Sequence, residues 1–105
     1  MEKGREFVER LSALLSKVLG VVAAPLPSRG GRLKRFPGLK AGSLEIRTTA
    51  SRVPRFSTLL EVAESSRQDE TMIPVGIAKA DGEEAEDSIV IMSLSAFLAI
   101  LKKGA

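Results

Sequence analysis

The segment MIPVGIAKA, residues 72–80, most restricts the folds open to this chain, because its apolar residues run on almost without a break. A strand with one solvated face alternates apolar and polar side chains, whereas a strand covered on both faces is apolar throughout. Residues 72–80 therefore predict a central strand with other elements packed on both faces, as in an α/β layer structure.

Helical periodicity predicts elements that can cover such a strand. Apolar residues recur every three or four positions over residues 2–19, and Gly20 ends the pattern. A second helix is predicted at about residues 57–67, and a third helix closes the chain. The apolar face of the third helix consists of Leu94, Phe97, Leu98 and Leu101.

Both later helices have capping residues near their predicted starts. Thr58 and Glu61 have the spacing of a capping box, in which each side chain covers a free backbone N–H group. Ser93 or Ser95 is expected to cap the third helix.

The remaining strands are predicted to be short, and they cover residues 21–24, 39–41, 43–49 and 88–92. The first of them is expected to be buried, and the two in the middle turn at Gly42. Residues 25–35 and the acidic segment 81–87 are expected to be loops. The predicted order over the single domain 1–105 is α-β-β-β-α-β-β-α.

The absence of two residue types excludes several kinds of chemistry. The chain has no Cys and no His. Disulfides, thiolate metal sites, imidazole-bound zinc and Ser-His or Cys-His catalysis are therefore excluded. Any metal ion would be held by oxygen ligands, which suit Mg²⁺, Mn²⁺ or Ca²⁺. Asn, Trp and Tyr are also absent, which fits either a hot habitat or a GC-rich genome.

The N-terminal apolar run does not resemble a signal peptide. Lys17 interrupts the run, and Glu2, Glu6 and Glu9 precede it where a signal peptide has basic residues. No segment approaches the ~20 consecutive apolar residues of a membrane span. We therefore expect a cytoplasmic protein.

The basic residues are concentrated in one part of the chain. Residues 28–55 hold eight basic residues and one acid, a balance of +7, although the net charge is only +3. Six of the eight are Arg, which suits phosphate contacts. A basic segment in an otherwise acidic chain indicates nucleic-acid binding, and a solvated loop is the alternative. The candidate DNA-binding residues are Arg29, Arg32, Lys34, Arg35, Lys40, Arg52 and Arg55.

Four segments together resemble one nuclease family. They are KGREFVERL, APLPSRGGR, FPG followed by LEIRT, and the C-terminal segment from PVGIAKADG to the last helix. In order and spacing they are similar to the archaeal Holliday junction resolvase-like branch of the PD-(D/E)xK nucleases, which includes small phage-encoded members. The resemblance implies a restriction-endonuclease-like core, a mixed sheet flanked by helices, and a homodimer that binds branched or duplex DNA.

The resemblance also implies a divalent-metal site, with Mg²⁺ or Mn²⁺ as the cofactor if the chain is active. Glu45 and Arg47 would be the catalytic pair, and Glu6, Glu9 and Glu45 the metal ligands. In such nucleases, carboxylates hold the ions that activate water. Without the family, Glu6 and Glu9 are ordinary partners of a helix dipole, and Glu45 with Arg47 is a surface ion pair.

The chain departs from the family pattern at three points. Gly38 follows Pro37 where the family has Asp, and Arg47 replaces a Lys. The family's helix carboxylate would fall on Val8, between Glu6 and Glu9. Three functions remain open: a DNA-binding protein with lost or weakened catalysis, an active metal-dependent endonuclease, and a protein-interaction module that retains the fold.

Overall fold

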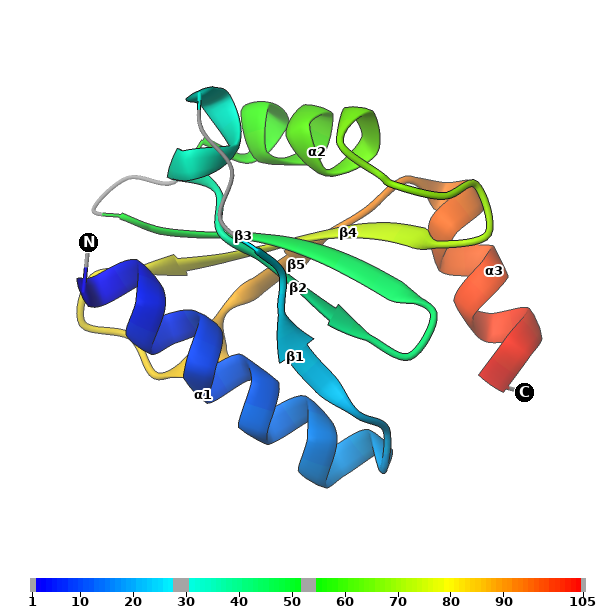
Figure 1. Cartoon of the computed structure of the whole chain (residues 1–105), viewed down its shortest axis with the longest axis horizontal. Helices are drawn as coiled ribbons and strands as arrows, with labels where there is room; N and C mark the ends of the chain where they lie inside the picture. Colours follow the sequence, from blue (N-terminus) through cyan, green and yellow to red (C-terminus); the bar gives the residue numbers. More distant parts are fainter. Residues whose placement is uncertain (1, 28–30, 52–54, 105) are drawn as a thin grey trace.

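A five-stranded mixed sheet forms the centre of the computed structural model, which describes residues 2–27, 31–51 and 55–104 (Figure 1). The strands are β1 (Ala23–Pro25), β2 (Gly38–Ala41), β3 (Leu44–Ser51), β4 (Ile73–Ala80) and β5 (Ile89–Ile91). They lie in the order β1-β2-β3-β4-β5. Only β3 and β4 pair in parallel, and the other neighbours are antiparallel.

Helices cover both faces of this sheet. They are α1 (Glu2–Leu19), α2 (Phe56–Ser65) and α3 (Leu94–Gly104), with 3-10 turns at η1 (Gly31–Arg35) and η2 (Ala85–Asp87). Figure 1 shows α1 below the sheet, α2 above it, and α3 beside one end. The predicted element order and a mixed sheet flanked by helices are confirmed.

The position of β4 follows from its connection to β3. Two parallel neighbours cannot be joined by a hairpin, and α2 forms the crossover between them. On its other side β4 pairs with β5, so the strand is central. Its first six residues, Ile73 to Ala78, are all buried. The prediction that residues 72–80 form a covered central strand is confirmed.

The main core lies between α1 and the sheet. Phe7 and Leu11 of α1 are each 3% exposed, and they belong to one apolar cluster with Leu39, Ile46 and Val75 of the three middle strands. Burial of a large apolar side chain contributes roughly 1.5–3 kcal/mol. The bounds of α1 are those predicted from the apolar periodicity of residues 2–19, whereas the buried face includes Val8 and Ser12 and leaves Val18 exposed.

The helix starts differ in part from the sequence prediction. Because α2 begins at Phe56, Thr58 already lies inside the helix, and its predicted capping box is wrong. Arg55 is the N-cap residue, and its side chain makes no capping hydrogen bond. At α3, Ser93 is the cap, since its Oγ accepts a hydrogen bond from the Ala96 N–H at 3.1 Å.

The first strand and the predicted loops also differ. The strand expected over residues 21–24 is β1, which begins at Ala23 and is mostly exposed because it pairs with β2 alone at the sheet edge. The expected loop 25–35 includes η1, and the acidic turn 81–87 includes η2. Among the described helices, none combines the length and the apolar character needed to cross a membrane.

The opposite face of the sheet packs closely against α2 at Gly76. A Cβ atom on Gly76 would lie 2.8 Å from Leu59 Cγ and 2.9 Å from Ile91 Cγ2. Leu59 is fully buried. The absence of a side chain at position 76 therefore sets how closely α2 approaches the sheet.

We expect Gly76→Ala to lower the free energy of unfolding by about 1–3 kcal/mol, because the added methyl group overpacks this contact. In a Leu59→Ala background the same substitution should cost less, since one of the two clashing side chains has been shortened. Urea unfolding of the four proteins measures both costs. Equal costs in the two backgrounds would contradict this packing.

Candidate functional site

The turn at Gly42 brings the two halves of the nuclease-like motif together. Gly42 has a φ of 60°, which glycine adopts without the steric cost that other residues bear. The resulting β2–β3 register sets Gly38 opposite Arg47 and Lys40 opposite Glu45. Side chains alternate along a strand, so Glu45 and Arg47 lie on one face of β3. Their hydrogen-bond partners, Ser66 and Gln68, directly follow α2, so this is the face of the sheet near α2.

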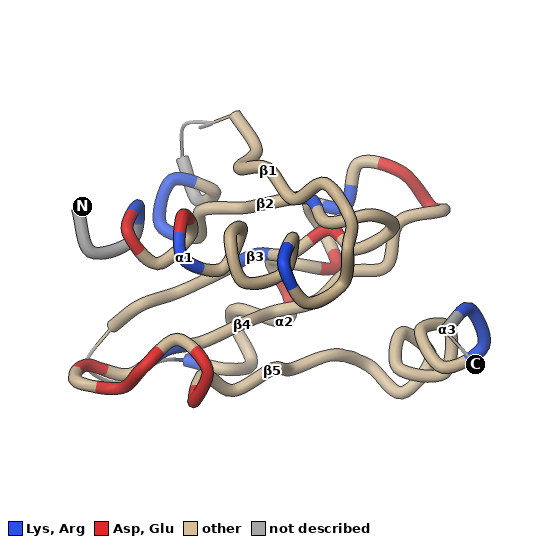
Figure 2. The backbone as a smooth tube through the Cα atoms, turned by 90° about the horizontal axis from the view of Figure 1, so that it is seen from below, with Lys and Arg blue, Asp and Glu red and all other residues tan. Residues whose placement is uncertain are grey.

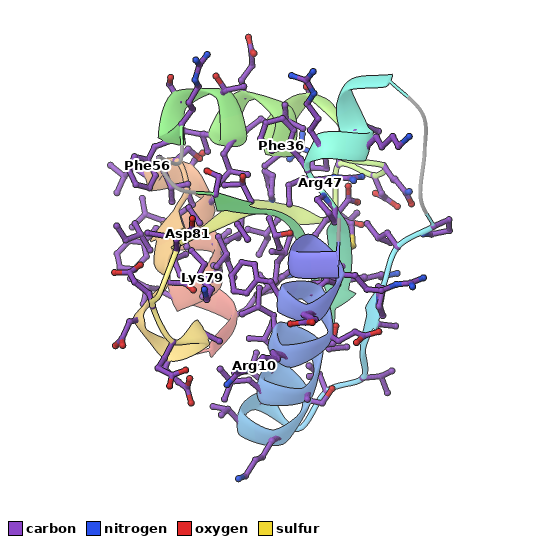
Figure 3. All side chains as sticks on the ribbon, turned by 90° about the vertical axis from the view of Figure 1, so that its left-hand side faces the viewer. Arg10, Phe36, Arg47, Phe56, Lys79 and Asp81 are labelled. Atoms are coloured by element: carbon purple, nitrogen blue, oxygen red, sulfur yellow. The ribbon has the colours of Figure 1, made fainter. Side chains whose placement is uncertain are left out.

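Arg47 is buried, with 4% of the residue exposed. Its Nε donates a hydrogen bond to Ser66 Oγ at 3.1 Å, and its Nη1 donates one to the Phe36 carbonyl at 3.3 Å. Figure 3 shows Arg47 and Phe36 near each other, between η1 and the N-terminal end of α1. Arg47 therefore connects the segment after η1, strand β3 and the residue that caps the C-terminal end of α2.

Gly38 provides the space for this guanidinium. A Cβ atom at position 38 would lie 2.9 Å from Arg47 Nη1 and 3.0 Å from Arg47 Cζ. The guanidinium thus occupies space that a side chain at position 38 would otherwise fill. This position is where the resemblance implies an Asp, so a positive group lies where the family has a carboxylate.

Glu45 is buried beside the loop that follows α2. Only 3% of the residue is exposed, and Oε1 accepts a hydrogen bond from the Gln68 N–H at 3.1 Å. Its other oxygen, Oε2, is buried and has no hydrogen-bond partner within the described residues.

Asp69 stabilises the loop that holds Gln68. The Thr71 N–H and hydroxyl both donate to Asp69 Oδ1 at 2.8 Å. The backbone hydrogen bond, followed by that of the Thr71 side chain, lowers the pKa of the Asp69 carboxyl below its usual value. The loop is therefore held in the conformation that presents an N–H group to Glu45.

A basic cleft opens beside Arg47. Its volume is about 420 Å³, and it lies between the first half of α1, the end of β1, η1 and the start of β2. Three cationic residues and one acid line it: Arg5, Lys34, Arg47 and Glu9. Arg47 also lines a second cavity of about 530 Å³ with Arg67 at the end of α2.

The basic cleft and the second cavity include residues that sequence reasoning missed. Arg5 and Arg67 lie outside the basic segment 28–55, and they reach the site only through the packing of α1 and α2. The sequence offers one weak indication for Arg5: it lies four residues before Glu9, so both side chains share one face of α1.

The predicted metal ligands are not brought together. Glu6 and Glu9 are exposed on α1, and only Glu9 lines the basic cleft, whereas Glu45 is buried and does not line it. In the part of the chain that the structure describes, no group of three or more acidic residues could hold a metal ion. Because the Arg47 cation lies at Gly38, the residues present do not fit Mg²⁺ or Mn²⁺.

The predicted DNA-binding residues occupy several places. Lys34, Arg35, Lys40 and Arg55 are exposed. Arg29 and Arg52 lie outside the described residues, and Arg32 belongs to η1 without a described side chain. Figure 2 shows the basic residues of η1 and the acidic segment around η2 at opposite edges of the sheet.

No protein-family model, curated protein or solved structure matches this chain. Its function is therefore argued from its own residues and their arrangement.

We expect Ser66→Ala to lower the free energy of unfolding by about 1.5–3 kcal/mol, because it removes a hydrogen-bond acceptor from a buried charged group. The neighbouring Ser65 is exposed, and its Oγ donates only a long 3.5 Å bond to the Val62 carbonyl. Ser65→Ala is thus the matched control, expected to change stability by less than about 0.5 kcal/mol. Equal effects in thermal unfolding would contradict the role of Ser66.

Proposed function

We propose that this chain binds branched or duplex DNA through its phosphates and has lost or weakened the cleavage chemistry of the nucleases it resembles. The observation that supports this most strongly is the basic cleft, with Arg47 buried in its wall and Arg5 and Lys34 beside it. Exposed Arg35 extends the same positive surface along η1.

The composition of this surface suits phosphate rather than a neutral ligand. Arginine presents a planar set of N–H donors that matches the oxygens of a phosphate group. Contacts to phosphates supply most of the affinity of proteins that bind DNA without reading its sequence. The predicted element order, together with the placement of Glu45 and Arg47 on one strand next to Gly38, supports a resolvase-like core.

Weak or absent catalysis follows from the charge beside Gly38. A divalent ion needs several oxygen ligands, and among the described residues Glu45 is the one buried carboxylate. The Arg47 guanidinium repels a cation at short range, and an arginine side chain stays protonated, so it cannot act as a general base.

A homodimer is the second part of the proposal. Leu94, Phe97, Leu98 and Leu101 of α3 are between 46% and 70% exposed, and Ile89 and Val90 of β5 are about half exposed. Several exposed large apolar side chains on one helix are typical of protein interfaces. A two-fold dimer would place two copies of the basic cleft on one DNA molecule.

We expect the logarithm of the DNA affinity to fall linearly with the logarithm of salt concentration, by about 0.9 per phosphate contact. Lys34→Ala with Arg35→Ala should reduce this slope by about two units. Fluorescence anisotropy with labelled four-way junctions and duplexes, repeated over a range of salt concentrations, measures this slope. In a separate assay, the same mixtures with Mn²⁺ should show little or no cleavage of the DNA.

The matched control is Lys102→Ala with Lys103→Ala, which removes the same charge from the end of α3, far from η1 (Figure 2). The salt dependence of DNA binding by this control should have the same slope as that of the wild-type protein. Salt-independent binding would contradict the DNA proposal, and Mn²⁺-dependent cleavage that Glu45→Ala abolishes would establish an active nuclease instead.

We expect light scattering to give twice the mass of one chain at micromolar concentration, and Leu98→Glu to reduce it to the mass of a monomer. A charged side chain in the centre of an apolar interface cannot be solvated when the interface forms. Val22→Glu is the control, because Val22 is 86% exposed but lies outside α3 and β5. A monomeric wild-type protein would exclude the homodimer and leave the apolar surface for a different partner.

A further inference from the structure

We propose that two copies of this chain pair edge to edge through β5, in antiparallel orientation, so that two five-stranded sheets join into one continuous sheet. The two-fold axis passes beside Val90, the middle residue of β5. This inference rests on the homodimer of the proposed function, and it names the surface, the orientation and the register through which that dimer forms.

The outer side of β5 is an open strand edge. The strand pairs with β4 through Ile89, Val90 and Ile91, and it is the last strand in the order of the sheet. Figure 2 shows β5 along the outer border of the sheet, with the acidic segment around η2 at one end and α3 at the other. Backbone groups that point away from β4 therefore have no strand partner among the described residues, and such an edge is a template for a further strand.

The two edges of the sheet differ in how well they accept another strand. At the opposite edge, β1 contains Pro25, which has no N–H group to donate and so disfavours further pairing. In contrast, β5 has the sequence Ile-Val-Ile and carries neither a charge nor a proline. The whole segment 88–101 has no Asp, Glu, Lys or Arg. The β5 edge therefore lacks the residues that usually keep an edge strand single.

The side chains of β5 leave apolar surface on both faces of the sheet. Ile91 lies opposite Gly76, on the face that packs against α2, so Ile89 faces α2 as well. Val90 lies opposite Ile77 of the main core, so it faces the side of α1. Ile89 is 52% exposed and Val90 is 53% exposed.

An added strand covers both of these side chains at once. A helix or a small ligand placed on one face of the sheet would cover Ile89 or Val90, and it would leave the other in water. The side chains of a further strand alternate between the two faces, so they pack beside both residues. The occupant that the edge fits is therefore a β-strand.

The lack of charge favours a second copy of the chain as the source of that strand. A two-fold interface places the same surface of each copy against the other, so any charge near its centre would face a like charge. Residues 88–101 present none. The helix that follows β5 also exposes Leu94, Phe97 and Leu98, and a second copy brings an equally apolar surface to cover them.

The charges at the two ends of this segment favour the antiparallel orientation. Glu86 and Asp87 are exposed just before β5, whereas Lys102 and Lys103 are exposed at the end of α3 (Figure 2). Antiparallel pairing brings the acidic segment of each copy to the end of β5 at which the other copy continues into α3. Parallel pairing would bring the two acidic segments together. Because these charges are exposed, they favour an orientation without supplying most of the affinity.

The length of β5 determines the register. A strand of three residues pairs with its copy along its whole length only when the two Val90 residues lie opposite each other. Ile89 of one copy then lies opposite Ile91 of the other. Residues directly opposite have Cα atoms about 4.5–5.5 Å apart, which a disulfide can span. The two Ile89 residues would be offset by two positions, beyond the roughly 7 Å limit of a disulfide.

Cysteine cross-linking tests this register, because the chain has no Cys and a single introduced one can link only to its copy. On mild oxidation, Val90→Cys should give a band of twice the chain mass on a non-reducing gel. Ile89→Cys and Ile91→Cys should each link slowly alone and readily when the two variants are mixed. Val22→Cys is the control: Val22 is 86% exposed but lies outside β5, so it should link slowly.

A charge on the edge strand should prevent the pairing. Light scattering of Val90→Lys should give the mass of one chain, with an unchanged circular dichroism spectrum because the side chain is half exposed. Val22→Lys should remain a dimer. Amide hydrogen exchange of the wild-type protein needs no substitution: amides of β5 should exchange more slowly at high than at low protein concentration, because pairing protects those that point outward.

The outcomes separate this inference from the proposed function. A wild-type protein that is monomeric at micromolar concentration would overturn both the β5 pairing and the homodimer. A dimer that persists in Val90→Lys, and that Val90→Cys does not link, would overturn the β5 pairing and leave a homodimer formed through α3 alone. A linked Val90→Cys dimer whose DNA binding does not depend on salt would support the interface and overturn the DNA proposal.

Discussion

The hydrogen bonds of the buried Arg47 guanidinium join strand β3 to the segment after η1 and to the C-terminal end of α2. Burying a charged group is costly unless hydrogen bonds replace the lost water. Here the Phe36 carbonyl and Ser66 Oγ provide two of them. The end of η1 and the C-terminal end of α2 are therefore positioned by the same side chain of β3. The basic cleft on one side of Arg47 and the cavity at the end of α2 on the other both depend on this arrangement.

The sheet provides the support that this side chain requires. Arg47 pairs with Gly38 on one side and with Gly76 on the other. Both neighbours lack side chains, so the face of the sheet around Arg47 has room for a long side chain and for Leu59 of α2. The two glycines thus have related roles: Gly38 admits the guanidinium, and Gly76 admits the helix that carries Ser66 toward it.

Sequence patterns within one segment correctly predicted the elements whose formation depends mainly on that segment's own residues. The continuous apolar run of residues 72–80 is β4, the periodicity of residues 2–19 is α1, and Gly42 is the turn between β2 and β3. The capping box was wrong because the start of a helix depends on where the preceding chain leaves the sheet, and α2 begins two residues before Thr58.

The candidate site was only partly predictable for a related reason. The pairing of the Pro37–Gly38 segment with Glu45 and Arg47 follows from a hairpin, which is local. The burial of Arg47 depends on Phe36 and Ser66, and Ser66 is 19 residues away in sequence. Arginine is rarely buried, so no composition rule indicates that this one is. The contribution of Arg5 to the cleft depends in the same way on how α1 packs.

The Arg47 guanidinium lies against position 38, so the residue at this position bears on which ligand the site can prefer. A carboxylate there would lie against Arg47, and the resulting pair would be neutral and would hold neither a cation nor an anion well. A carboxylate together with a shorter, less rigid base in place of Arg47 would favour a cation. Glycine together with arginine leaves the space at position 38 to the guanidinium, which lines the basic cleft. The two departures from the nuclease pattern are therefore physically coupled, because a side chain at residue 38 would begin 2.9 Å from Arg47 Nη1 and would require the guanidinium to shift.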